Sequence, residues 1–114
     1  RFRVNSKLVE GQPDIYFTKK RIAVFVHGCY WHRHANCKFA YTPKSNVDFW
    51  MKKFVSNVER DKVVLNVLHQ ECIRVIVIWE CTVKKMMSDN LIKEECLSEI
   101  TTFINSEEPQ NMEL

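Results

Sequence analysis

The sequence predicts a single α/β domain in which helices flank one mixed sheet. Three observations indicate this class: a β-branched run at residues 22–26, a second at residues 73–79, and helical apolar spacing between them. The 114 residues fit one domain, and 46% of them are hydrophobic, which is too apolar for a disordered chain. A chain of this size buries roughly 65% of its unfolded surface, so a core can form without disulfides.

Three strands and a long loop are expected in the first part of the chain. Residues 2–4 predict a short strand, and a Gly-Gln-Pro turn signal at residues 11–13 introduces a second strand at residues 14–17. The run at residues 22–26 predicts a third strand, buried on both faces. Residues 27–44 have neither a helical nor a strand period, and therefore predict a loop that needs something other than hydrophobic burial to hold its shape.

Two helices and one strand follow this loop. A capping-box pattern at residues 45–48, with Asp in place of the usual Glu, opens a long amphipathic helix. The apolar positions of this helix are Val47, Met51, Phe54, Val58, Leu65 and Leu68. Residues 73–79 predict an interior strand of the sheet, residues 91–104 a last helix, and residues 106–114 a polar tail that is frayed and flexible.

Cysteine and histidine crowd the predicted loop. Cys29, His34 and Cys37 have the spacing C-x4-H-x2-C, and Cys81 lies just beyond the last strand, from which a sheet could return it to the loop. Zinc binds Cys and His in a four-coordinate tetrahedral shell, with a binding energy on the order of 10 kcal/mol that suffices to order such a loop. The alternatives are a pair of free buried cysteines and a disulfide between Cys29 and Cys37.

The net charge and the number of cysteines limit the classes of protein that fit this sequence. The net charge is +3 and the sequence pI is about 8.6, a mild basic excess that is compatible with nucleic acid but decides nothing alone. The five cysteines form an odd set, and no apolar run is long enough for a signal sequence or a membrane span, which favours a reducing compartment. Cys72 and Cys96 have no histidine nearby and are expected to be small buried residues.

Five motifs in one order resemble the very-short-patch repair (Vsr) DNA mismatch endonuclease family, over residues 2–81. They are GQPDI at 11–15, VFVHGCYWH at 24–32, DFW at 48–50, NVERD at 57–61 and VIWEC at 77–81. The resemblance implies a fold related to type II restriction endonucleases, a structural Zn²⁺ and Mg²⁺-dependent nicking of one DNA strand beside a T·G mismatch. It further implies a monomer that acts on double-stranded, mismatched DNA in the bacterial cytoplasm at the nucleoid, together with other mismatch-repair proteins.

The resemblance also implies catalytic roles for individual residues. Asp14 corresponds to the magnesium-binding aspartate, and the backbone carbonyl of Val26, where the family often has Thr, to a second ligand. His32 matches the histidine that activates the attacking water, and His27 matches a second active-site histidine. Without the resemblance, both histidines could equally be exposed loop residues or alternative zinc ligands.

Aromatic and polar residues correspond to DNA contacts. Tyr30, Trp31 and Trp50 match positions that the family inserts into the base stack next to the mismatch, and Trp31, in a polar loop, is expected to be exposed. Lys53 and Asn57 follow Trp50 by one and two helical turns and are expected to contact DNA on the same side. Core packing, the alternative role of such rings, is predicted for Phe49, Phe54 and Trp79.

The sequence departs from the family in two places. The family has an N-terminal helical region with a glutamate that assists the active site, whereas this sequence starts at Arg1. We therefore expect one Vsr-like domain over residues 1–114 that lacks this region and is weakly active or inactive. The segment at residues 34–37 is one residue longer than in the family. The rival functions are a zinc-stabilised DNA-binding module without catalysis, a restriction-like endonuclease on unmodified duplex, and a domain whose aromatic residues bind protein.

Overall fold

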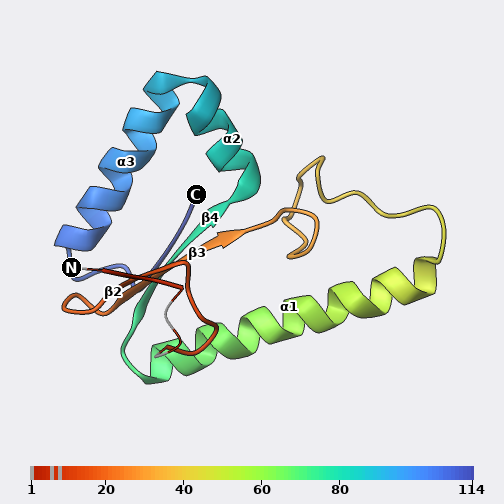
Figure 1. Cartoon of the computed structure of the whole chain (residues 1–114), viewed down its shortest axis with the longest axis horizontal. Helices are drawn as coiled ribbons and strands as arrows, with labels where there is room; N and C mark the ends of the chain where they lie inside the picture. Colours follow the sequence, from red (N-terminus) through yellow and green to blue (C-terminus); the bar gives the residue numbers. More distant parts are fainter. Residues whose placement is uncertain (1, 6, 8) are drawn as a thin grey trace.

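The computed structural model describes residues 2–5, 7 and 9–114; Arg1, Ser6 and Leu8 lie outside the described part. Within that part, a five-stranded mixed sheet is combined with three helices (Figure 1). The strands are β1 (Arg3–Val4), β2 (Ile15–Phe17), β3 (Ile22–His27), β4 (Arg74–Trp79) and β5 (Asn111–Glu113), and the helices are α1 (Val47–Gln70), α2 (Glu80–Ser88) and α3 (Asn90–Asn105). The predicted α/β class with a mixed sheet is confirmed.

The strand order in the sheet is β1-β2-β3-β4-β5. β1, β2 and β3 pair antiparallel, whereas β4 is parallel to both β3 and β5. A parallel neighbour requires a crossover connection, and between β3 and β4 the long loop and α1 provide it. His27 lies opposite Trp79 in the register of β3 and β4, so the segments that follow these two strands leave the sheet at the same end.

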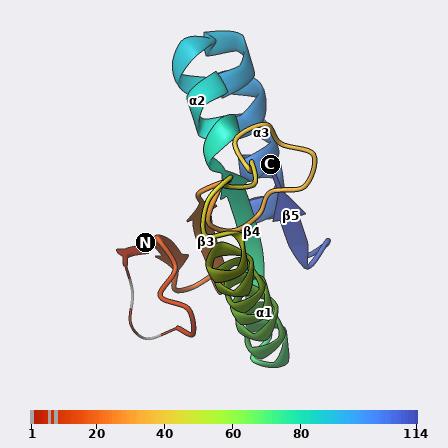
Figure 2. The ribbon, with the colours of Figure 1, turned by 90° about the vertical axis from the view of Figure 1, so that its right-hand side faces the viewer.

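Helices cover both faces of the sheet, which explains why the central strands are apolar throughout. On one face, Leu68 of α1 packs with Ala23 and Val75. On the other face, Phe103 of α3 packs with Ile76 and its neighbours. The ribbon shows α1 on one side of the strands and the α2–α3 pair on the other (Figures 1 and 2). Each buried aliphatic or aromatic side chain contributes roughly 1.5–3 kcal/mol.

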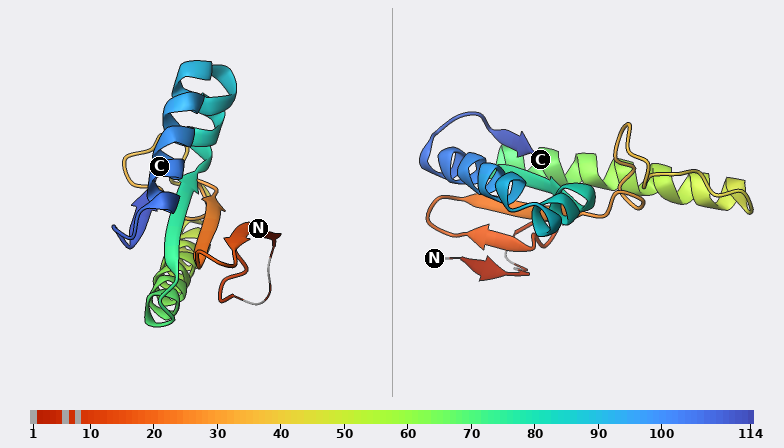
Figure 3. Two further views of the ribbon diagram at one scale, coloured as in Figure 1. Left: turned by 90° about the vertical axis from the view of Figure 1, so that its left-hand side faces the viewer. Right: turned by 90° about the horizontal axis from the view of Figure 1, so that it is seen from above.

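α1 extends beyond the sheet, so its apolar stripe is core only in part (Figure 3). Phe54 is buried as predicted, but Met51 is 44% exposed, and the prediction of a core position is wrong for Phe49, which is 60% exposed on the overhanging part. The predicted capping box is also wrong, because α1 begins at Val47 after Asn46 in the left-handed conformation, without a side-chain cap. Although α1 is long, neither it nor any other helix in the described part of the chain is apolar enough to span a membrane.

The predicted elements did not include α2 or β5. α2 begins directly after β4, and β5 occupies part of the segment 106–114 that was expected to be a flexible tail. β5 instead pairs with β4 from Asn111 to Glu113. The guanidinium of Arg74 holds the connection from α3, donating to the carbonyl oxygens of Phe103, Ser106 and Pro109 at 2.6–3.1 Å. β5 has a single apolar residue, Met112, between two polar ones. Such a short alternation is too weak to predict a strand from the sequence.

Candidate metal centre and active site

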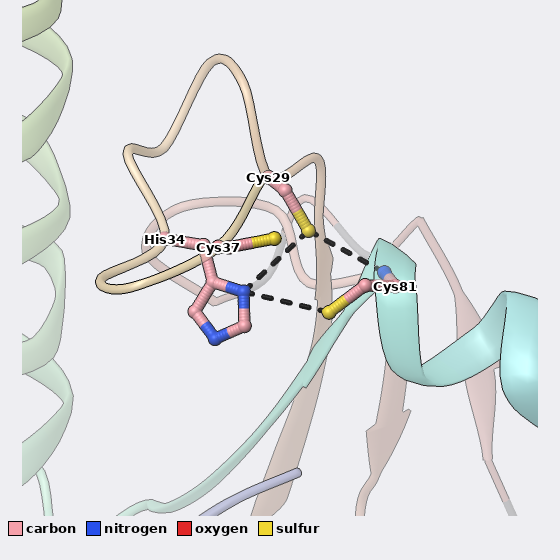
Figure 4. A group of neighbouring side chains, drawn as sticks. All are labelled: Cys29, His34, Cys37 and Cys81. Carbon is pink, nitrogen blue, oxygen red and sulfur yellow. Dashed lines mark hydrogen bonds between the residues drawn. The ribbon is translucent and has the colours of Figure 1, made fainter. Parts of the chain in front are cut away.

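The four predicted metal ligands converge between the loop after β3 and the first turn of α2 (Figure 4). The ligand atoms of Cys29, His34, Cys37 and Cys81 all lie within 4.8 Å of one another. Nδ1 of His34 is 3.6 Å from Sγ of Cys29 and 3.5 Å from Sγ of Cys81. Tetrahedral bonds of about 2.3 Å to sulfur and about 2.0 Å to nitrogen separate the two donor atoms by about 3.6 Å. These two distances therefore fit a tetrahedral site, and Cys37 completes a Cys₃His set of possible ligands.

The surroundings of the sulfur atoms act on the thiol pKa values in opposite directions, raising that of Cys29 and lowering that of Cys37. Burial raises the pKa of Cys29 to about 11, so this thiol holds its proton at neutral pH unless a cation replaces it. The backbone N–H of Cys81 donates to Sγ of Cys29 at 3.4 Å. At Cys37 burial also acts to raise the pKa, but the N–H groups of Phe39 and Ala40 and the two other thiols outweigh it, and the pKa is lowered. Such N–H donors stabilise thiolates that bind a metal ion.

No disulfide links these cysteines, since all five described cysteines are free. The alternative of a Cys29–Cys37 disulfide is therefore not what the structure contains. Of the two cysteines outside the cluster, Cys96 is half-buried, whereas Cys72 is exposed and the prediction that it is buried is wrong. Cys72 lies in the turn after α1 with a φ of 60°, a left-handed conformation of the kind that ends many helices.

Arg33 braces the loop that carries three of the ligands. Its guanidinium donates to the carbonyl oxygens of Ala40 and Tyr41 at 2.9 and 3.0 Å and lies 4.0 Å from the centre of the Phe54 ring. Sequence analysis assigned no role to this arginine, because its partners are main-chain carbonyls of the same loop, which leave no side-chain pattern. Together with the metal ligands, Arg33 replaces the hydrophobic core that the loop lacks.

The predicted DNA-contact residues lie where this loop meets α1. Trp31 is 46% exposed, as predicted, and its ring centroid is 5.7 Å from that of Trp50. Tyr30 is half-buried among other rings. Lys53 is exposed at the rim of the cavity described below. Asn57, by contrast, donates from Nδ2 to the carbonyl of Trp31 at 3.1 Å, so it holds the loop against α1.

The predicted catalytic residues line one open cavity of about 930 Å³ at the same end of the sheet. Asp14 directly precedes β2 and faces the end of β3, where its Oδ2 accepts the backbone N–H of Val26 at 2.7 Å. His27 ends β3, and the ring of His32 stacks on it with a centroid distance of 4.0 Å and an angle of 6°. The structure therefore brings Asp14, His27 and His32 together.

Asp61 is a fourth site residue, to which the sequence assigned no role. It lies on α1 one turn after Asn57, and its Oδ2 is 2.7 Å from Nδ1 of His32. A carboxylate accepts hydrogen bonds, so this contact assigns the ring proton to Nδ1 and leaves Nε2 of His32 as a free acceptor. The available signal was helical spacing: an acid four residues after Asn57 lies on the face that meets the loop.

The two stacked histidines are not arranged to share one metal ion. Donor atoms of His27, His32 and Asp61 do lie within 4.8 Å of one another. However, a metal ion binds an imidazole nitrogen in the plane of the ring, and two stacked rings inclined by only 6° have no common in-plane position between them. Both imidazoles are therefore available to water or phosphate.

The neutral form of His27 is favoured at physiological pH. Burial lowers its pKa and neighbouring His32 lowers it further, while Asp61, Asp14 and Glu113 act in the opposite direction. We expect an NMR titration of the His27 ring to have its midpoint below 6.5, and the midpoint to return to about 6.5 in denaturant. A folded pKa below the unfolded one means that stability is complete above about pH 6.5 and decreases as the pH falls below it. A midpoint above 6.5 would contradict this prediction.

Comparison with known proteins bears on what this site does. The family described as "DNA mismatch endonuclease Vsr" matches residues 1–38, which contain Asp14, both histidines of the cavity and three of the four clustered ligands. The type II nicking enzyme V.NmeAIP of Neisseria meningitidis serogroup A is 44% identical over 84 residues, which cover 74% of this chain and 59% of that enzyme. The resemblance to the Vsr family is confirmed.

Two further relatives extend the comparison. The type II nicking enzyme V.XorIIP of Xanthomonas oryzae pv. oryzae is 43% identical over 81 residues, 71% of this chain and 59% of that enzyme. The DNA mismatch endonuclease Vsr of Escherichia coli K12 is 34% identical over 95 residues, 82% of this chain and 60% of that enzyme. The chain thus spans about three fifths of the length of these three relatives.

Proposed function

We propose that this chain is a magnesium-dependent endonuclease that nicks one DNA strand at or near a T·G mismatch, the reaction of very-short-patch repair. The observation that carries the proposal is the shared cavity of Asp14, His27 and His32, next to a Cys₃His cluster. The names of the Vsr relatives support DNA nicking. A mixed sheet with the site at one end is also compatible with a restriction-endonuclease-like fold, which we propose for this domain.

The Cys₃His cluster would hold Zn²⁺ in a structural role. Thiolate sulfur and imidazole nitrogen are the donors that zinc prefers, and four protein ligands leave no open position for a substrate. The loop between Cys29 and Cys37 contains His32, Tyr30 and Trp31. Fixing the ends of this loop therefore also fixes residues that the proposal assigns to catalysis and DNA binding.

Asp14 and the backbone carbonyl of Val26 would hold Mg²⁺. Oδ2 of Asp14 accepts the N–H of Val26, so Oδ1 would be the oxygen that binds the ion. The N–H and C=O of one strand residue point to the same neighbour, so the carbonyl of Val26 also faces the edge where Asp14 lies. Both donors are hard oxygen atoms of the kind that magnesium prefers. When bound there, the ion would neutralise negative charge on the scissile phosphate and polarise it.

His32 would act as the general base. Its bond to Asp61 fixes the tautomer, so Nε2 can accept a proton from water, and Asp61 stabilises the imidazolium that forms. The lowered pKa of His27 keeps that ring neutral, and its N–H can donate to a phosphate oxygen or orient the water. In this arrangement His32 would transfer the proton, and His27 would position the phosphate or the water.

Trp31 and Trp50 would recognise a damaged base stack. A mispaired step costs less to unstack than a sound one, and an inserted ring replaces part of the lost stacking, which selects mismatched duplex. Lys53 on the rim of the cavity would position the phosphate backbone of the double-stranded DNA, on which the chain acts as a monomer.

A nicking assay tests this function. The substrates are supercoiled plasmid and two duplexes that differ only in one base pair, T·G in one and T·A in the other. Each is incubated with the chain, with and without Mg²⁺. We expect weak, Mg²⁺-dependent nicking of the T·G duplex, at least tenfold faster than nicking of the T·A duplex. Binding without nicks under all conditions would instead support a non-catalytic DNA-binding module, and equal rates on both duplexes would support a restriction-like endonuclease.

Replacement of Asp61 tests the assignment of His32. In Asp61→Asn the amide can donate to Nδ1 of His32, which stabilises the wrong tautomer and places the proton on Nε2. We expect kcat to fall by about 10²-fold, within the range of general-base contributions, and KM to change little. Glu59→Gln, an exposed position on the same helix, is the matched control and should nick normally. Unchanged kcat in Asp61→Asn would contradict the dyad.

A further inference from the structure

The C-terminal strand brings a third acidic side chain, after Asp14 and Asp61, to the cavity of the proposed active site. In the register of β4 and β5, Glu113 lies beside Val77, and it lines the same cavity as Asp14, His27 and His32. Neither the sequence motifs nor the family match include this residue. β5 is therefore part of the wall of the site.

Trp79 connects Glu113 to the rest of the site. The indole N–H of Trp79 donates to Oε1 of Glu113. One face of the indole stacks on the ring of His34, with a centroid distance of 4.2 Å and an angle of 8°. The ring also contacts His27 edge-on, with a centroid distance of 5.3 Å. One buried side chain therefore touches a ligand of the Cys₃His cluster and a residue of the catalytic cavity, and Glu113 accepts its only polar hydrogen.

β5 is held firmly enough to fix Glu113. The N–H of Leu114 donates to the carbonyl of Val77, and the N–H of Trp79 donates to the carbonyl of Leu114, both at 2.9 Å. Nε2 of His69, at the end of α1, lies 2.6 Å from Oδ1 of Asn111. Hydrogen bonds on both sides of Glu113 thus set the position of its carboxylate relative to Trp79.

The geometry points to Glu113 as a positioning residue that acts through Trp79 on His27 and His34. The inference deepens the proposed nicking function and rests on it. The indole is 8% exposed, and an unpaired N–H at such a position is unfavourable. Without its acceptor, the indole would turn about the soft torsion between Cβ and the ring, and its contact with His27 would change. Displacements of about 1 Å in an active site lower rates by up to about 10²-fold.

The test compares variants that separate the hydrogen bond from the charge. Glu113→Gln keeps an oxygen acceptor, Glu113→Ala removes it, and Trp79→Phe removes the donor but keeps an aromatic ring. We expect kcat to fall about tenfold in Glu113→Ala and in Trp79→Phe, with unchanged KM. Glu113→Gln should retain most of the rate, and the double variant Glu113→Ala/Trp79→Phe should be no slower than either single one. Glu107→Ala, in the connection before β5, is the neutral control.

A second measurement does not depend on nicking. In NMR spectra of the metal-loaded chain, Glu113→Ala should shift the resonances of the Trp79 indole N–H and of the His27 ring, while Glu113→Gln should leave the His27 ring in place. Additive losses of kcat, or a His27 ring unaffected by Glu113→Ala, would overturn the inference. If the wild-type chain does not nick DNA at all, the proposed function fails, and the NMR comparison alone decides whether Glu113 positions His27.

Discussion

Replacing Asp14 with Asn should reduce nicking by about 10³-fold or more while leaving the fold intact. The amide oxygen of Asn can still accept the N–H of Val26, the bond that Asp14 makes in the structure. What the variant loses is the negative charge that would hold Mg²⁺. Stabilisation of the transition state by a bound metal ion amounts to several kcal/mol, and each 1.36 kcal/mol corresponds to about a factor of ten in rate.

The measurement is single-turnover nicking of the T·G duplex over a range of Mg²⁺ concentrations. Asp48→Asn is the matched control, because Asp48 is an exposed acid in the first turn of α1 and does not line the cavity. Thermal unfolding of both variants should match that of the wild-type chain. A rate for Asp14→Asn equal to that of the wild type would refute the assignment of Asp14, whatever the fate of the other site residues.

Sequence analysis found the two interior strands because their apolar pattern reflects burial on both sides. Residues 22–26 and 73–79 are nearly continuous apolar runs because α1 and α3 cover opposite faces of β3 and β4. The predicted return of Cys81 to the loop has the same basis. β3 and β4 are parallel, and His27 lies opposite Trp79 in their register. Cys29 and Cys81 each follow two residues later, so both lie at the same end of the sheet.

The features that sequence analysis missed depend on contacts between polar residues far apart in the chain. β5 is anchored by Arg74 and by its pairing with β4, so its own residues need little hydrophobicity. Asp61 and Glu113 acquire their roles from partners 29 and 34 residues away, at His32 and Trp79. Helical periodicity likewise cannot show where a helix overhangs its sheet, which is why Phe49 was assigned to the core.

Loss of the Zn²⁺ proposed for the Cys₃His cluster should disorder the loop after β3 while leaving the sheet folded. The two hydrophobic clusters of the core draw on the strands, α1 and α3 and contain no residue of this loop. The loop depends instead on the four possible metal ligands, on Arg33, on the hydrogen bond from Asn57 and on the aromatic contacts of Tyr30. A structural zinc site contributes on the order of 10 kcal/mol, so a chelator or Cys29→Ser removes the largest single stabilising contribution to the loop. His32, Tyr30 and Trp31 lose their positions with it, and nicking should fall to background.

Hydrogen exchange separates this local effect from global unfolding. In the chelated chain and in Cys29→Ser, amides of the loop should lose protection, whereas amides of β3 and β4 should keep theirs and the far-UV circular dichroism should change little. Because His34 stacks on Trp79, the tryptophan fluorescence should change as well and recover when Zn²⁺ is added back to the wild-type chain. Cys72→Ser, at an exposed thiol outside the cluster, is the matched control and should behave as wild type. Full protection of the loop after complete removal of the metal would show that Arg33 and the aromatic contacts hold it unaided, and the cluster would then have no structural role.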